Sequence, residues 1–355
     1  MATTGRPRLS ATGVLAGLGV GVPLLAAPMA GGASTPDLVA AAAAAGGLGF
    51  LAAGYLSTAA LAAQIGETRS RADRFGVNLF VPNPVPVSRE VYDRYAATLR
   101  PVAAAHGVEL PTGPPREDED EWVEKVALLC ADPVPVVSFT FGVPEAAVVR
   151  AVRAAGSITA QTVTTTDEAR AAAAAGVDVL IAQAAGAGGH SATTTPTIPP
   201  TVPPADVPLP HLIRRIAAAS RLPVWATGGL SRPEHVRAAL DAGAEAVAVG
   251  TVLLRSPESG ASAVHRAALA DPDRTATVLT TAFSGRPARA LRNEFTDRFT
   301  EGAPLGYPAI HHLTGPLRRA ATAAGDPEAV HLWAGLGWRD ATDRPAAEIL
   351  QRLVS

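Results

Sequence analysis

A single histidine follows a short apolar run and a glycine-rich turn, and this spacing could carry chemistry. The run Val177–Ala182 ends at the polar Gln183, which is typical of a strand buried on both faces. Three glycines (Gly186, Gly188 and Gly189) then lead to His190. In α/β proteins such loops carry the chemistry, and glycines let a flat ligand approach the backbone. The sequence therefore indicates a ligand beside the His190 imidazole, with a tight turn and a solvent-facing histidine as the alternative interpretation.

Two further glycine patches follow the last two apolar runs of the repeating pattern described below. They are ATGGLS after the first of these runs and VGT after the second. Backbone N–H groups in such loops bind phosphate without lysine or arginine, and (β/α)8 barrels commonly bind phosphate after strands seven and eight. Tight turns also favour glycine, so a structural role is the alternative. We predict a phosphate site at these two patches, Ala226–Ser231 and Val249–Thr251.

Polar or otherwise special residues also stand in or just after other apolar runs. They are Met29 with its neighbour Pro28, then Asn78, Gln161 and Gln183. A buried amide must find hydrogen-bond partners, and a planar heterocycle offers both donors and acceptors. Each amide alone is equally compatible with a hydrogen bond inside the core. No metal-ligand pattern accompanies them, because the eight histidines are scattered and the sequence has no HxxxH or CxxC.

The elements that must position these residues form a repeating pattern. Short apolar runs alternate with alanine-rich segments that often end in glycine, as expected for helices followed by parallel strands. Eight alternating units predict an α/β fold of the (β/α)8 (TIM) barrel type, with a doubly wound open sheet as the alternative. The predicted strands are Val22–Ala27, Gly47–Ala52, Phe75–Phe80, Val134–Phe139, Ser157–Thr162, Val177–Gln183, Leu222–Thr227 and Ala246–Gly250.

The remaining segments predict additions to the barrel. We expect the barrel to occupy residues 1–265, with an insertion at 83–133 that holds two helices. Residues 191–210 form a Pro-rich loop, which we interpret as a lid over the site rather than a surface excursion. Residues 266–355 no longer alternate and predict a small, mainly helical region that packs near the active-site face.

The composition limits the classes of function. A net charge of −2 with no long basic run argues against nucleic acid as the main partner. The one cysteine allows no intrachain disulfide and suits a reducing compartment. Residues 9–30 superficially resemble a secretory signal, but glycines, two prolines and the first predicted strand argue against one. We expect no membrane span and a cytoplasmic protein, with a homodimer possible.

Several motifs together resemble the nitronate monooxygenases, formerly called 2-nitropropane dioxygenases, over about Leu18 to Trp338. The combination of AGGH with SGRPARALRN is the most specific part, since other flavin and phosphate barrels share the glycine patches. The matching segments are AAPMAGG (Ala26–Gly32), GGLGFLAAG (Gly46–Gly54), FGVNLFVP (Phe75–Pro82), AQTVTTTDEA (Ala160–Ala169), AGGH (Ala187–His190), ATGGL, VGT and SGRPARALRN.

The resemblance implies an FMN-containing TIM barrel that oxidises alkyl nitronates, such as propionate 3-nitronate, or nitroalkanes with O2 to a carbonyl compound and nitrite. It implies His190 as the catalytic residue and the FMN phosphate on the two glycine patches. The cofactor-binding residues expected in this way are Ala27, Pro28, Met29, Asn78, Gln161, Gln183, Ala187, Gly188, Gly189, Gly228, Gly229, Gly250 and Thr251.

The sequence departs from the family pattern at three places. Gly186 stands where the family commonly has glutamate, Ser191-Ala192 where it often has Arg-Gly, and Leu336 where a glutamine is usual. These changes make the neighbourhood of His190 less polar, so they leave the identity of the substrate open.

Three other functions remain compatible with the sequence. An NAD(P)H-dependent FMN reductase of the enoyl-acyl-carrier-protein or quinone reductase type shares the fold and the GGH loop, and it is the main alternative. A flavin-free barrel acting on a phosphate metabolite would be colourless. A non-catalytic ligand-binding barrel would hold FMN without turning over any donor.

Overall fold

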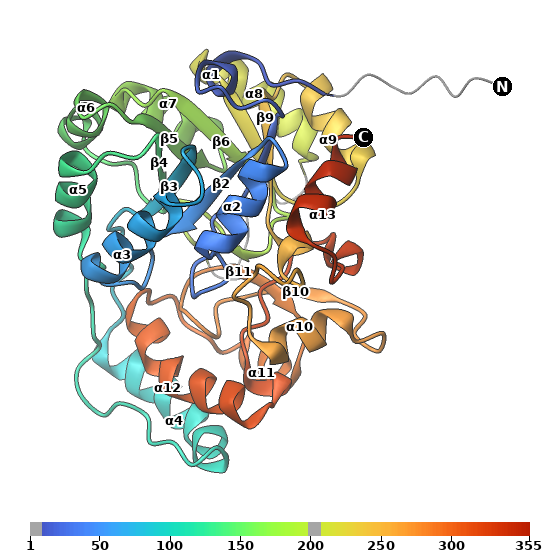
Figure 1. The fold of residues 1–355 in the computed structure, drawn as a ribbon. Helices are drawn as coiled ribbons and strands as arrows, with labels where there is room; N and C mark the ends of the chain where they lie inside the picture. Colours follow the sequence, from blue (N-terminus) through green and yellow to red (C-terminus); the bar gives the residue numbers. More distant parts are fainter. Residues whose placement is uncertain (1–8, 198–206) are drawn as a thin grey trace.

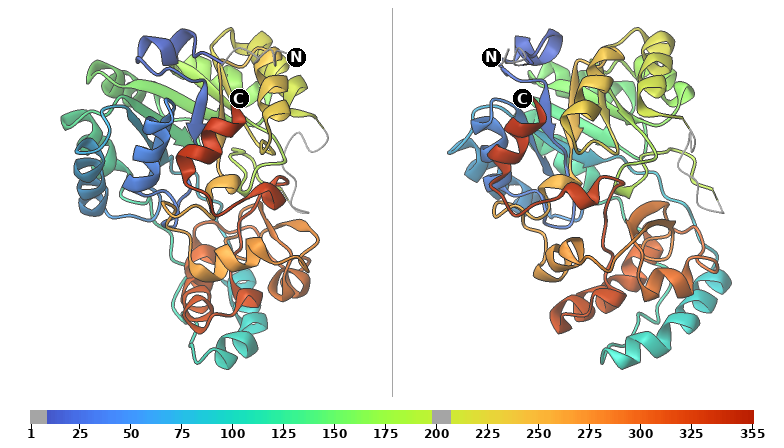
Figure 2. Two further views of the ribbon diagram at one scale, coloured as in Figure 1. Left: turned by 45° about the vertical axis from the view of Figure 1, so that its right-hand side comes forward. Right: turned by 90° about the vertical axis from the view of Figure 1, so that its right-hand side faces the viewer.

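Eight parallel strands close into a barrel. Figures 1 and 2 show helices around these strands. The computed structural model describes residues 9–197 and 207–355. The first strand pairs with both the second and the last, which closes the barrel, so the TIM-barrel prediction is confirmed and the open-sheet alternative is wrong. The barrel strands, each overlapping a predicted one, are β1 (Leu24–Ala26), β2 (Leu48–Ala52), β3 (Phe75–Phe80), β4 (Val136–Thr140), β5 (Ile158–Val163), β6 (Val179–Gln183), β8 (Val224–Thr227) and β9 (Ala246–Val249).

Apolar side chains fill the barrel on the inside and cover it on the outside. Phe50, Ile181 and Trp225 belong to the inner core, which α1 (Gly13–Gly17) extends with the buried Leu15. The helices outside the strands pack their own apolar faces against the sheet. They are α2 (Pro36–Ala44), α3 (Thr58–Arg69), α5 (Trp122–Ala131), α6 (Ala146–Ala154), α7 (Thr166–Ala175), α8 (Leu209–Ser220), α9 (Pro233–Asp241) and α13 (Ala346–Leu353).

Local signals explain where these helices begin and end. The Thr165 side chain accepts a hydrogen bond from the Glu168 backbone in a capping box, which fixes the start of α7. Gly176 ends the same helix with a φ of +90°, a backbone conformation that glycine adopts without a steric cost. The next strand can therefore begin almost at once, which is the repeated connection that the sequence pattern predicts.

A second lobe lies against one end of the barrel and combines two distant parts of the chain. Tyr92, Tyr95 and Leu99 of α4 (Arg89–Ala105) form one buried cluster with Phe295 and Ile310. Figures 1 and 2 show α4 beside α12, so the 83–133 segment supplies one helix to this lobe and α5 to the barrel. The lobe also contains α10 (Ala263–Ala270), α11 (Glu294–Phe299) and α12 (Ala309–Ala324). Three short 3₁₀ helices among the described residues are η1 (Thr251–Leu253), η2 (Pro327–Ala329) and η3 (Trp338–Asp340).

A small antiparallel sheet joins the lobe to the barrel. Its order is β10 (Thr277–Thr280), β11 (Ala288–Leu291) and β7 (Gly189–His190). The sequence predicts a plain loop at residues 189–190 and a mainly helical region after 265, so this sheet is an addition to the predicted fold. Because β7 contains only two residues, it has no periodicity to recognise, and its partner lies far along the chain. The backbone of His190 pairs with Ala288, so the lobe holds the histidine in place.

The predicted lid falls on the Pro-rich loop, and the centre of that loop, residues 198–206, lies outside the described residues, so the lid stays a prediction. Within the described ranges, no helix has the length and apolar character needed to cross a membrane.

Candidate active site

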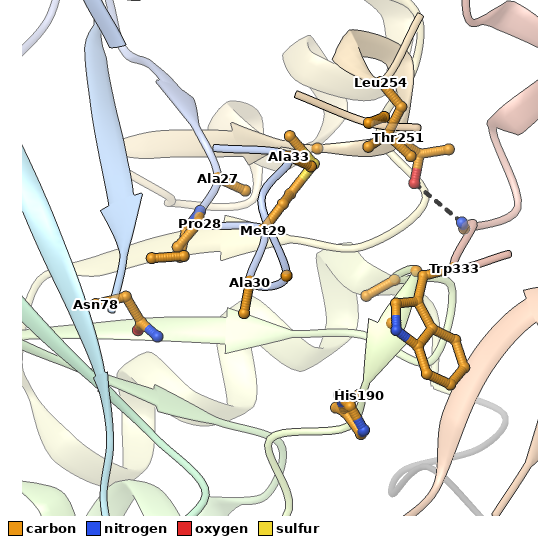
Figure 3. A pocket seen from close by; sticks show the side chains of 18 of the residues that line it. Ala27, Pro28, Met29, Ala30, Ala33, Asn78, His190, Thr251, Leu254 and Trp333 are labelled. Carbon is orange, nitrogen blue, oxygen red and sulfur yellow. Dashed lines mark hydrogen bonds between the residues drawn. The ribbon is translucent and has the colours of Figure 1, made fainter. Parts of the chain in front are cut away.

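A cavity of about 680 Å³ opens between the carboxyl ends of the barrel strands and the second lobe. Its volume lies within the range of roughly 300–1,000 Å³ that is usual for small-molecule sites. Figure 3 shows residues after β1, Asn78 of β3 and His190 around the same space. The structure brings nearly all the predicted site residues to this lining: Ala27, Pro28, Met29, Asn78, Gln183, Ala187, Gly188, Gly189, His190, Gly228, Gly229, Gly250 and Thr251.

Gln161 is the predicted site residue that lies outside the lining. Its side chain is buried, and Nε2 donates to the carbonyl oxygens of Gly142 and Thr162, both at 3.0 Å. These bonds hold the turn after β4 against β5. Its Oε1 is buried and accepts no hydrogen bond from any described residue. One end of the amide therefore has a core role, and the predicted ligand contact at Gln161 stays a prediction.

Asn78 presents a fixed hydrogen-bond donor to the cavity. Its Oδ1 accepts from the hydroxyl groups of Ser138 and Thr140, both at 2.9 Å. These two bonds orient the amide, and Nδ2 makes no hydrogen bond to any residue that the structure describes. Since Asn78 lines the cavity, its NH2 group is available to an acceptor atom of a bound ligand.

Gln183 braces the segment that carries His190. Its Nε2 donates to the carbonyl oxygen of His190 at 3.2 Å, and its Oε1 accepts from the backbone N–H of Ala192 at 2.8 Å. Both ends of the amide therefore hold the chain on either side of Ser191. The sequence predicts a ligand contact at Gln183, and the structure adds this positioning role.

The glycine patches leave backbone donors free at the carboxyl ends of β8 and β9. Gly228 and Gly229 have φ values of +111° and +75°, which only glycine adopts readily. Among the described residues, none accepts a hydrogen bond from the backbone N–H of Gly228, Gly229 or Gly250. The Thr251 hydroxyl accepts from the N–H of Gly335 at 3.0 Å and keeps its own proton to donate. This arrangement suits a phosphate.

Close backbone packing explains the glycines before His190. A Cβ at position 188 would lie 2.5 Å from the backbone nitrogen of Gly335 and 2.9 Å from the Thr251 hydroxyl. Only glycine allows the loop to approach the 334–336 segment so closely. The glycine patch after β9, which contains Thr251, and the loop that carries His190 therefore form one wall of the cavity.

An aromatic cage and one hydroxyl group surround His190. Ring centroids of Trp333, Phe141 and Tyr307 lie 5.2, 5.7 and 6.0 Å from the imidazole centroid. The imidazole Nε2 lies 2.9 Å from the Ser284 hydroxyl, which also lies within hydrogen-bond distance of the Arg286 carbonyl oxygen. Ser284 can either accept from Nε2–H or donate to Nε2, so the other nitrogen, Nδ1, can serve as an acceptor or as a donor.

Burial lowers the pKa of His190 to about 3, and the charges of Arg286 and Arg318 act in the same direction. A lowered histidine pKa means that the imidazole is neutral at every pH above that value. Neither ring nitrogen has a carboxylate partner among the described residues, unlike the histidines of a serine hydrolase triad. His190 is therefore a neutral hydrogen-bonding group and a weak base in the free protein.

Comparison with known proteins identifies the family. The family model described as nitronate monooxygenase matches residues 14–355. A probable nitronate monooxygenase of Staphylococcus aureus strain Newman is 35% identical over 344 residues, covering 95% of each chain. Among solved structures, a nitroalkane oxidase from Streptomyces ansochromogenes is 43% identical with a TM-score of 0.90 and covers 96% of each chain. FabK from Thermotoga maritima is 26% identical with a TM-score of 0.73, covering 96% of this chain and 94% of that one.

The chain belongs to the nitronate monooxygenase family. It is accordingly a flavin-dependent oxidoreductase that acts on a small molecule. The cavity fits a flavin on three observations: free backbone donors at the glycine patches, a wall that only glycine permits, and the Asn78 donor inside the lining. The same residues that the sequence singles out would therefore hold the group.

Two of the departures from the nitronate monooxygenase pattern lie next to each other. A Cβ at position 186 would lie 3.3 Å from Cδ1 of Leu336, and the Leu336 N–H donates to the Gly186 carbonyl at 3.0 Å. Gly186 and Leu336, which stand where the family commonly has glutamate and glutamine, are therefore neighbours joined through the backbone, and the Leu336 side chain is 61% exposed.

Sequence reasoning missed one face of α12 and two further histidines. His311, Gly315 and Arg318 line the cavity, and so do Thr322 and Arg319. Their spacing of four, three and four residues places His311, Gly315, Arg318 and Thr322 on one helix face, and this periodicity could have been read from the sequence. His265 and His331 also line the cavity, and burial lowers the pKa of both histidines.

An ion pair from the 83–133 segment positions Tyr55 at the cavity. Asp120 Oδ1 accepts from the Tyr55 backbone N–H at 2.9 Å, and Lys125 Nζ lies 2.8 Å from Asp120 Oδ2. Tyr55 has a φ of +70° and stacks on His311 with ring centroids 4.2 Å apart. Asp120, in the acidic run before α5, therefore holds a strained residue of the cavity wall.

We expect Asp120→Ala to destabilise the protein by roughly 3–5 kcal/mol, because it leaves the buried Lys125 without its carboxylate partner. Urea unfolding followed by circular dichroism measures this change. The exposed Glu119→Ala variant is the matched control and should change the free energy of unfolding by less than about 0.5 kcal/mol. Equal stabilities for Asp120→Ala and Glu119→Ala would contradict the positioning role of the ion pair.

Proposed function

We propose that this protein oxidises alkyl nitronates with O2 to a carbonyl compound and nitrite, using FMN as its flavin. The observation that carries the proposal is the position of His190. Its imidazole is neutral, aromatic rings surround it, and its loop packs against Thr251 in the glycine patch after β9. Family membership and the nitroalkane oxidase relative support it.

FMN is the flavin that the cavity supports best. A single phosphate would use the free N–H groups of Gly228, Gly229 and Gly250 together with the Thr251 hydroxyl. The ring system would lie against the Ala27–Met29 turn, near the Asn78 amide and His190. The bound flavin would supply the electron transfer, while the protein supplies position and polarity.

His190 is suited to an anion that has already lost its proton. A nitronate is a carbanion equivalent, so its oxidation needs no strong base. With Ser284 donating to Nε2, the imidazole presents Nδ1–H to a nitronate oxygen, and the neutral ring keeps this donor over the whole physiological pH range. The three aromatic rings leave the imidazole few polar neighbours besides Ser284, so a ligand in the cavity is the natural partner of Nδ1.

Neutral nitroalkanes are the second candidate substrates, and the name of the Streptomyces ansochromogenes relative favours them. In this case His190 would act as the base through Nδ1, with Ser284 accepting from Nε2–H. The low pKa of His190 makes the free imidazole a weak base, although a nitronate formed beside it would stabilise the imidazolium. We therefore expect the preformed nitronate to react faster than its parent nitroalkane.

An oxygen-uptake assay on the purified yellow protein tests the proposed function. We expect uptake with propionate 3-nitronate, accompanied by nitrite, and no comparable turnover of NADH with a quinone. Turnover of NADH without nitronate oxidation would instead support the reductase alternative. Acid release of the flavin followed by chromatography tests the cofactor, and FAD in place of FMN would contradict the single-phosphate assignment.

A further inference from the structure

Two buried arginines near His190 form no ion pair with a described residue. Arg286 is fully buried and Arg318 is 6% exposed. Within the described part of the chain, no carboxylate forms an ion pair with either guanidinium. Burying a charge without a counter-charge is costly, so such residues are expected to serve an anion that arrives from outside.

Arg318 reaches the cavity directly from the lining face of α12. Its Nε donates to the Thr314 hydroxyl at 3.0 Å, and Nη2 donates to the carbonyl oxygen of His311 at 2.9 Å. These bonds fix the guanidinium plane. Nη1 makes no hydrogen bond to any described residue, and the side chain lines the cavity. Arg318 therefore offers a free, oriented cationic donor to a ligand.

Arg286 lies behind the His190 cage and outside the cavity lining. Its guanidinium carbon stands 4.1 Å from the centre of the Phe141 ring, and Nε donates to the carbonyl oxygen of Ser191 at 3.4 Å. Nη2 contacts the carbonyl oxygen of Thr193, while Nη1 is buried without a partner. Arg286 thus orients the segment after His190 and adds a positive charge behind it, with the Glu168 carboxylate on the far side of Thr193 as the acidic group that acts on it.

The other titratable groups around His190 leave this positive charge in place. Burial lowers the pKa of His311 and His331 and raises that of Tyr55 and Tyr307, so all four are neutral near pH 7. The nearest acidic groups form no ion pair with either arginine among the described residues, although the charge of Glu168 favours the charged form of Arg286. Asp120 pairs with Lys125, and Glu168 accepts hydrogen bonds from Thr164, Thr165, Thr193 and Thr194.

We propose that Arg318, supported by the field of Arg286, binds the negatively charged group of the substrate, and that His190 contributes no charge to this recognition. The proposal deepens the proposed function and rests on it for the identity of the substrate. The binding chemistry itself is independent of turnover, because any small planar anion should occupy the same place. Nitrate, which is planar like the nitronate group, is a suitable probe.

Calorimetric titration of nitrate into the flavin-loaded wild-type protein tests the source of the charge. Burial lowers the pKa of both arginines only to about 10, so they stay charged, and His190 stays neutral, across this range. We expect the nitrate affinity to stay within about twofold between about pH 6 and about pH 9. If a protonated His190 bound the anion, the affinity would fall about tenfold for each pH unit above its pKa, and that result would overturn the proposal.

Three variants separate charge from structure. We expect Arg318→Met to weaken nitrate binding about tenfold or more, and Arg318→Lys to stay within about threefold of wild type, because lysine keeps the charge. Arg286→Met should weaken nitrate binding less than Arg318→Met does, because the Arg286 charge acts on the anion from a distance. The Arg286→Met variant also provides a second test if Arg318→Met fails to hold flavin. Unchanged nitrate binding in both methionine variants, or equal losses in Arg318→Lys and Arg318→Met, would contradict the proposal. Normal nitrate binding without nitronate oxidation would refute the proposed function alone.

Discussion

His190→Ala should keep its flavin and lose about a hundredfold or more of kcat/KM with neutral nitroalkanes, while turnover of a preformed nitronate should fall less. The size of the loss follows from the usual contribution of a positioned acid or base, about 10²–10⁴-fold. A preformed nitronate needs no proton removal and would lose only the Nδ1–H hydrogen bond. Steady-state oxygen uptake with both forms of one nitroalkane measures the difference.

Ser284→Ala is the matched control for this prediction. It keeps the imidazole but removes the hydroxyl that holds Nε2 at 2.9 Å. We expect an intermediate loss on both substrates, because the ring remains and only its orientation is weakened. Unchanged nitroalkane oxidation in His190→Ala would remove the histidine from the proposed role, whatever Ser284→Ala does.

Gly228→Val should give a folded protein that contains little or no flavin. A Cβ at this position would lie 2.7 Å from the Ala184 carbonyl oxygen, and the φ of +111° is unfavourable for valine. The loop would have to move, and its free N–H groups would no longer face a phosphate. The ratio of flavin absorbance to protein absorbance after purification measures the effect.

Gly156→Val separates the steric effect from backbone strain. Gly156 has a φ of +107°, close to that of Gly228, but a Cβ there would meet no atom of a described residue within 4 Å. Gly156→Val should therefore be destabilised to a similar degree by strain while keeping its flavin. Equal flavin contents in the two variants would show that the β8 loop does not hold the phosphate.

The sequence predicts the barrel well because its signals are local. Each helix of the pattern has its own start and stop, as at Thr165 and Gly176, so eight repeated units specify a closed sheet. The glycine patches and His190 could be placed for the same reason: each directly follows a predicted strand. In a parallel barrel the carboxyl ends of all strands lie at the same end, so the residues that follow the strands meet there.

The parts that the sequence does not predict depend on distant contacts. The two-residue strand at His190 exists because Ala288 pairs with it, and Ser284 is brought to the imidazole by the same β11 connection. Asp120 looks like a solvated acidic residue until Lys125 is seen to be buried beside it. Gln183 is a residue type that can contact a ligand, and the sequence predicts that role. Its two hydrogen bonds to the His190 segment arise only in the folded chain.

Anaerobic mixing of the flavin-loaded protein with a preformed nitronate, followed by flavin absorbance, tests the central claim most directly. The account predicts a rapid absorbance change with the nitronate at neutral pH, a slower change with the parent nitroalkane, and none with NADH. A flavin that responds to NADH but not to nitronate would contradict the proposed chemistry of the His190 cavity.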